Sequence, residues 1–117
     1  MVRRLHQIST YLLISLGVVH TSLTPAFNKE FSVEAMYFAS AGLAMVVTGF
    51  LNIAMRRNAE DRPTVILCRM ANALFTAFGL LTAMAIREPQ AYFGVVLLLA
   101  ITATSFLLRA RERAAEK

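Results

Sequence analysis

Residues 32–55 decide the fold, and they read SVEAMYFASAGLAMVVTGFLNIAM. The stretch is almost wholly apolar, and the charged pair Arg56 and Arg57 follows it directly. A helix rises about 1.5 Å per residue and the hydrocarbon core of a bilayer is about 30 Å thick, so roughly 20 apolar residues are enough to cross it. The stretch therefore predicts a membrane-spanning helix, with Ser32 as its N-cap and Glu34 in its first turn.

Three further stretches have the same character, and they run from about residue 5 to 23, from 63 to 86 and from 89 to 108. Thr24-Pro25 makes continuation of the first helix unfavourable, whereas Pro63 and Pro89 open theirs at a position that needs no backbone N–H. The connections are short, which favours neighbouring helices that run antiparallel. We expect an all-α fold: one domain over residues 1–117, an integral membrane four-helix bundle with up-down-up-down order and a basic tail at 109–117.

The composition agrees with a membrane protein. Of the 117 residues, 57% are hydrophobic and 16% are charged, with a mean hydropathy of +0.58. Soluble domains carry about 25% charged residues, and disordered chains combine low hydrophobicity with high net charge, so both classes are excluded. A single Cys cannot form an internal disulfide framework.

The positive charges predict the orientation. Nine of the twelve Lys and Arg fall at the two termini and in the second connection; they are Arg3, Arg4, Arg56, Arg57, Arg62, Arg109, Arg111, Arg113 and Lys117. Because such residues are retained on the cytoplasmic side, both termini are expected in the cytoplasm. The minimal loops and the lack of an evident organelle signal favour a bacterial inner membrane. Topology and attraction to anionic lipid account for the net charge of +5, and dispersed basic residues without interleaved aromatics argue against nucleic-acid binding.

Small residues repeat along the helices. Ala35, Gly42 and Gly49 recur every seven residues, and Gly17 and Gly79 lie within the first and third spans. This spacing lets a neighbouring helix approach closely, so these residues are predicted to form helix-packing faces, within one chain or between copies.

Polar residues within the spans are the candidate sites, because such groups are costly in lipid and face the interior of a bundle. At the outer end, His20 and Glu34 are expected to lie close together, with Tyr37 nearby. A His–carboxylate pair can move a proton or bind a polar ligand. The alternative is a structural pair that joins the first two spans, or a Glu34 that only stabilises its own helix.

At the inner end, Asn52, Arg69 and Asn72 lie at similar depths along their helices and are predicted to form a cluster. This cluster is either a ligand site or a structural contact that holds the helices together. Arg69 has a second option, because its long side chain can reach the cytoplasmic headgroups.

Catalytic and cofactor motifs are missing from the sequence. His6 and His20, which are the only histidines, would lie about 21 Å apart along one helix, so they cannot share a metal ion or a haem. No phosphate-binding loop, dinucleotide fingerprint, nucleophile elbow or paired-cysteine motif occurs. We therefore assign no catalytic residue, metal or cofactor.

Parts of the chain resemble two families of small membrane proteins. Its length and four spans are similar to those of small multidrug resistance transporters, but the acidic residue of that family lies in the first helix, whereas Glu34 opens the second span here. Residues 23–27 (LTPAF) and 49–52 (GFLN) resemble parts of four-helix DoxX-like membrane proteins. Too few residues carry either resemblance to transfer a site or an activity.

These observations favour a non-enzymatic membrane protein that self-associates, or that serves as an accessory subunit of a membrane-protein partner. The alternative is a small-molecule transporter, or a protein that binds a lipophilic ligand such as a lipid or quinone, using the two polar ends. A membrane enzyme that uses His20 or Glu34 as acid or base is the third hypothesis.

Overall fold

The computed structural model describes the backbone of residues 1–27 and 29–115 and the side chains of residues 1–26 and 29–108. The described backbone is helical, with the order α1 (Val2–Ser22), α2 (Thr24–Phe27), α3 (Val33–Arg57), α4 (Arg62–Ile86) and α5 (Pro89–Ala115). Four of these helices are long and apolar enough to cross a membrane. The helical part of the prediction, with four candidate membrane spans, is thus confirmed.

Short polar motifs fix the starts of α3 and α4. The Ser32 side chain accepts a hydrogen bond from the backbone N–H of Ala35 at 3.1 Å, so the predicted N-cap of α3 is confirmed. Asp61 caps α4 by accepting from the backbone N–H of Thr64 at 3.1 Å. Pro63 follows in the first turn, where its missing N–H leaves no hydrogen bond unmade.

Arg87 ends α4 in the left-handed region, with φ 55° and ψ 35°. A side chain makes this conformation unfavourable, and glycine usually occupies it. Replacing Arg87 with glycine is therefore expected to raise the free energy of unfolding by about 0.5–1 kcal/mol. Unfolding by sodium dodecyl sulfate in mixed micelles would measure it, and an unchanged or lower stability would show that the Arg87 side chain itself supports the turn.

Two segments differ from the expected boundaries. The first helix ends at Ser22, but the chain makes one more helical turn, α2, with Pro25 in the first-turn position that suits proline. The last helix continues beyond Leu108 to Ala115, so its backbone includes most of the predicted basic tail. The side chains of that tail, and residues 116–117 altogether, lie outside the described residues.

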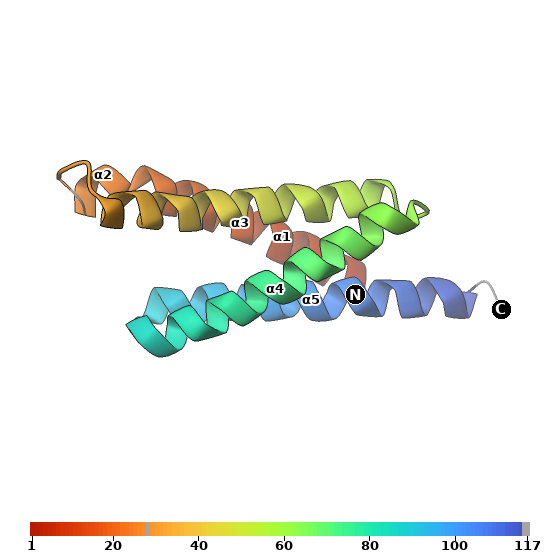
Figure 1. The fold of residues 1–117 in the computed structure, drawn as a ribbon. Helices are drawn as coiled ribbons and strands as arrows, with labels where there is room; N and C mark the ends of the chain where they lie inside the picture. Colours follow the sequence, from red (N-terminus) through yellow and green to blue (C-terminus); the bar gives the residue numbers. More distant parts are fainter. Residues whose placement is uncertain (28, 116–117) are drawn as a thin grey trace.

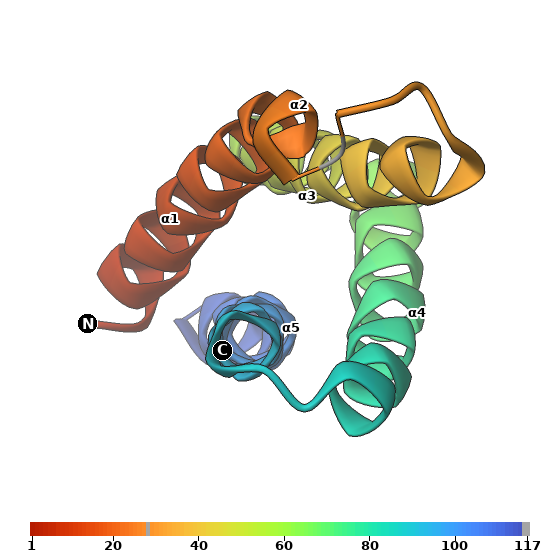
Figure 2. The same cartoon turned by 90° about the vertical axis from the view of Figure 1, so that its left-hand side faces the viewer.

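The long helices surround a common interior (Figures 1 and 2). α1 packs against both α3 and α5, and α4 packs along α5. In Figure 1, α4 crosses obliquely from the end of α3 to the level of α5. The contact of α4 with α3 is smaller than its contact with α5. The α3–α4 contact includes an apolar cluster of Met55, Val65 and Cys68. Leu13 of α1 joins Leu97, Leu98 and Ile101 of α5 in the second apolar cluster.

Glycines bring the backbones of α1 and α3 into contact. A Cβ atom placed on Gly17 would lie 2.6 Å from the carbonyl oxygen of Gly42, and one on Gly42 would lie 2.7 Å from the carbonyl oxygen of Gly17. Thr21, one turn further along α1, donates a hydrogen bond from its hydroxyl to the carbonyl oxygen of Ala39 at 3.4 Å. The close approach is therefore made within one chain, by backbone atoms that cannot rotate away.

Gly49 and Gly79 also face neighbouring helices. Gly49 faces the side chain of Ile14 on α1, and Gly79 faces Leu98 on α5, where an added Cβ would lie 3.1 Å from Cδ1. Ala35 is buried near the start of α3. These glycines thus serve the packing of helices inside the chain.

Candidate functional site: the basic end of the bundle

At the outer end, the structure does not join His20 to Glu34. The His20 ring stacks on Phe38, with ring centroids 3.8 Å apart and planes inclined by 18°. Glu34 and Tyr37 are exposed on the first turns of α3. Among the described side chains, no hydrogen bond or ion pair links these two residues to His20. At this end α1 and α3 thus meet through an aromatic contact, and not through the predicted pair of His20 and Glu34.

At the inner end, Asn52 and Asn72 form a reciprocal amide pair between α3 and α4. The Asn52 Nδ2 donates to Asn72 Oδ1 at 2.8 Å, and the Asn72 Nδ2 donates to Asn52 Oδ1 at 3.0 Å. His6 of α1 joins this pair through its Nε2, which lies 3.0 Å from Asn52 Oδ1. Because that oxygen can only accept, Nε2 carries the proton. Three helices are thus connected by one buried polar network.

Asn52 is the centre of that network. Its amide nitrogen also donates to the carbonyl oxygen of Thr48 at 2.8 Å, so both of its hydrogens and both lone pairs of its oxygen are used. Asn52, Asn72 and His6 are each fully buried. An amide with every hydrogen-bonding position filled has nothing left to offer a ligand, which favours the structural interpretation of this pair.

Arg69 does not join the two asparagines. Its Nη2 donates to the carbonyl oxygen of Ser105 on α5 at 2.8 Å, and its guanidinium lies 4.9 Å from the centre of the Phe106 ring. The arginine thus leaves the predicted cluster and turns toward α5. Arg69 also lines a cavity at the basic end of the bundle, together with Arg3 and Arg56.

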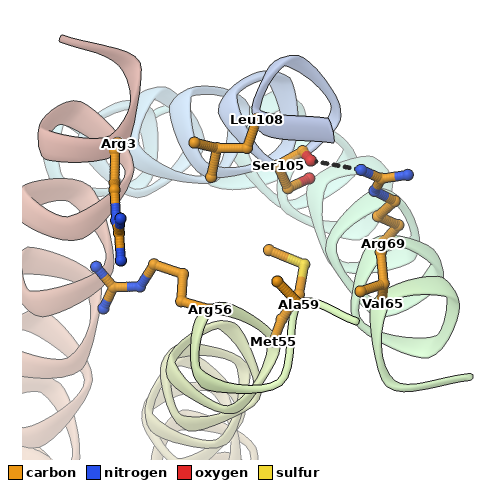
Figure 3. A pocket seen from close by; sticks show the side chains of 8 residues that line it. All are labelled: Arg3, Met55, Arg56, Ala59, Val65, Arg69, Ser105 and Leu108. Carbon is orange, nitrogen blue, oxygen red and sulfur yellow. Dashed lines mark hydrogen bonds between the residues drawn. The ribbon is translucent and has the colours of Figure 1, made fainter. Parts of the chain in front are cut away.

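A cavity of about 250 Å³ lies at this basic end (Figure 3). Residues from all four long helices and from the α3–α4 turn line it; they are Arg3, Met55, Arg56, Ala59, Val65, Arg69, Ser105 and Leu108. Three of these described lining residues are arginines and none is acidic. Met55, Val65 and Leu108 give the same cavity an apolar wall.

Three arginine side chains place positive charge around the cavity. Figure 3 shows the side chains of Arg3 and Arg56 reaching toward one another across one side of the cavity, with Arg69 on the opposite wall. The Arg56 Nε is buried and has no hydrogen-bond partner, and its guanidinium lies 5.8 Å from the centre of the Tyr11 ring. Like charges at short range repel each other, and more strongly where water is partly excluded. The cavity is thus electrostatically suited to an anion.

Sequence reasoning assigned Arg3 and Arg56 only to membrane orientation, and it gave His6 no partner. A signal for all three was present, because the predicted antiparallel bundle brings the start of the first span and the end of the second span to the same end. What the sequence alone did not provide was the rotation of α1 about its axis, which decides that His6 faces Asn52 and that Arg3 faces Arg56.

No protein-family model matches the chain, and the comparisons with curated proteins and with solved structures give no match either. The functional assignment therefore depends on the residues and geometry of this chain.

Proposed function

We propose that this chain is a non-enzymatic protein of a bacterial inner membrane that crosses the bilayer four times, with antiparallel neighbouring helices. Its four apolar helices support a location in the membrane. The concentration of Lys and Arg at one end supports an orientation with both termini in the cytoplasm.

The protein binds a small amphiphile with an anionic head at its basic end. The observation that carries this proposal is the cavity in which three arginines meet an apolar wall. Arginine binds carboxylate and phosphate groups through paired hydrogen bonds, and the apolar residues provide contact for a hydrocarbon chain. The ligand site thus uses Arg69 of the predicted inner cluster, with Arg3 and Arg56 in the place of the two asparagines.

The cavity at the basic end predicts a selective loss of lipid binding when its arginines are neutralised. Arg56→Gln is expected to weaken binding of phosphatidylglycerol about tenfold, because it removes one charge-assisted contact. Native mass spectrometry with phosphatidylglycerol and phosphatidylcholine would count the bound lipids. Arg62→Gln is the matched control, since Arg62 is exposed at the same end and lines neither of the cavities found there.

If Arg56→Gln and Arg62→Gln weaken lipid binding equally, the binding is due to general surface charge and not to the cavity. Unchanged binding in Arg56→Gln and in Arg3→Gln would refute the proposed site. Arg56→Lys keeps the charge and is expected to recover part of the affinity, which separates a loss of binding from a loss of folding.

Self-association is the second candidate, and it now depends on the outer face of α4. Large apolar side chains remain exposed along that helix; they are Ile66, Leu67, Met70, Leu74, Phe78, Leu80, Leu81, Met84 and Ile86. The glycines that first suggested assembly face other helices of the same chain. The mass spectra that count bound lipids also report the number of protein copies, so one experiment addresses both candidates.

A further inference from the structure

A second cavity adjoins the first at the basic end. It measures about 230 Å³ and is lined by six residues, which are Arg3, Gln7, Tyr11, Ile53, Arg56 and Arg57. Arg3 and Arg56 belong to the lining of both cavities. The two spaces therefore meet at these two arginines.

Each cavity has three arginines among its described lining residues and no acidic residue. Arg69 completes the set in the first cavity, and Arg57 completes it in the second. A guanidinium has five N–H donors in a fixed plane, so one arginine can donate to anions on two sides. The buried Arg56 Nε, which has no hydrogen-bond partner, shows that its donors are not exhausted by the protein.

We propose that the basic end binds a ligand with two phosphate groups, one in each cavity, with Arg3 and Arg56 contacting both. The inference rests on the proposed function and specifies the anion that it left open. Arginine forks match the oxygen atoms of phosphate, and two neighbouring negative groups balance four arginines better than one does. A two-phosphate lipid headgroup and a soluble diphosphate share this chemistry.

The linings of the two cavities favour the lipid source. Met55, Val65 and Leu108 give the first cavity apolar surface, whereas Gln7 and Tyr11 give the second polar groups. A phosphate with an attached acyl chain suits the first cavity. Basic pockets between membrane helices on the cytoplasmic side are typical sites for such headgroups.

The test uses the full-length protein in phosphatidylcholine nanodiscs. Cardiolipin, which carries two phosphates, is compared with phosphatidylglycerol at twice the molar amount, so that the phosphate content is equal. Arg57→Gln is expected to weaken cardiolipin binding about tenfold and to change phosphatidylglycerol binding less than about twofold. In a parallel arm, pyrophosphate is compared with inorganic phosphate on the protein in neutral detergent. A preference for pyrophosphate without one for cardiolipin would identify a soluble ligand.

Controls separate this inference from the proposed function. Arg62→Gln is expected to change neither ligand preference, and Arg57→Lys, which keeps the charge but not the planar fork, should retain part of the cardiolipin affinity. If one-phosphate and two-phosphate ligands bind equally well in both arms, or if Arg57→Gln weakens cardiolipin and phosphatidylglycerol binding to the same extent, the two-phosphate inference is overturned while anion binding stands. If Arg56→Gln and Arg3→Gln alter the binding of no anion, both the inference and the proposed function fail.

Discussion

Gly42→Ala is expected to lower the free energy of unfolding by about 2–3 kcal/mol. The added Cβ would meet the side chain of Thr21, and it would lie 2.7 Å from the carbonyl oxygen of Gly17 and 2.9 Å from the backbone N of Thr21. Since two of these atoms belong to the α1 backbone, a whole helix has to move, and overpacking of this kind typically costs 1–3 kcal/mol. Gly42→Leu should prevent the close approach of α1 and α3 altogether.

Gly94→Ala is the matched control. Gly94 also lies within a helix, but its nearest neighbour to an added Cβ is Leu16 Cδ2 at 4.0 Å, so there is room for the methyl group. Its expected effect is neutral, or a gain of up to about 1 kcal/mol, because alanine is the better helix former. Reversible unfolding in mixed micelles would measure both variants.

The dependence on protein concentration tells where the glycine contact lies. A contact within one chain predicts a Gly42→Ala loss that does not change with the ratio of protein to detergent. A loss that grows with dilution would place this face between copies instead, as the self-association hypothesis assumed. A Gly42→Ala variant as stable as Gly94→Ala would show that α1 and α3 do not touch at these glycines.

Hydropathy was enough to predict the helical class, because the length and apolar character of a span are local properties of the sequence. The Ser32 cap was predictable for the same reason, since it depends on residues only three positions apart. The oblique path of α4 was not predictable in this way (Figure 1). It depends on which side chains meet between helices, and small changes in side-chain size alter crossing angles.

The candidate sites were likewise predictable only in part. Depth along the helices placed Asn52 near Asn72, and the structure brings them together. Depth could not place Arg69, because a long side chain can reach in several directions and Ser105 provides a carbonyl oxygen that no sequence pattern marks. Arg3 and Arg56 were explained completely by membrane orientation, so their charge suggested no further role until the structure placed them in one cavity.

The buried amide network predicts the second large effect, which is a loss of about 2–4 kcal/mol for Asn52→Leu. The substitution removes the partner of His6 Nε2 and both hydrogen bonds of the Asn72 amide to Asn52. A buried polar group left without its partner costs about 1–3 kcal/mol, although single hydrogen bonds in membranes average about 0.6 kcal/mol. Ser40→Ala is the control, because the exposed Ser40 hydroxyl bonds only the carbonyl oxygen of Met36 on its own helix.

A double-mutant cycle then distinguishes a network from three independent residues. Combining Asn52→Leu with Asn72→Leu removes both members of the amide pair, so the double variant should lose about 1–2 kcal/mol less than the sum of the single variants. Additive losses would show that the two amides act separately, and a loss no larger than that of Ser40→Ala would contradict the network itself. None of His6, Asn52 and Asn72 lines either cavity at the basic end. Asn52→Leu should therefore lower the stability of the protein, while the molecules that remain folded keep their affinity for anions. That combination would separate the group that holds three helices together from the group that binds the ligand.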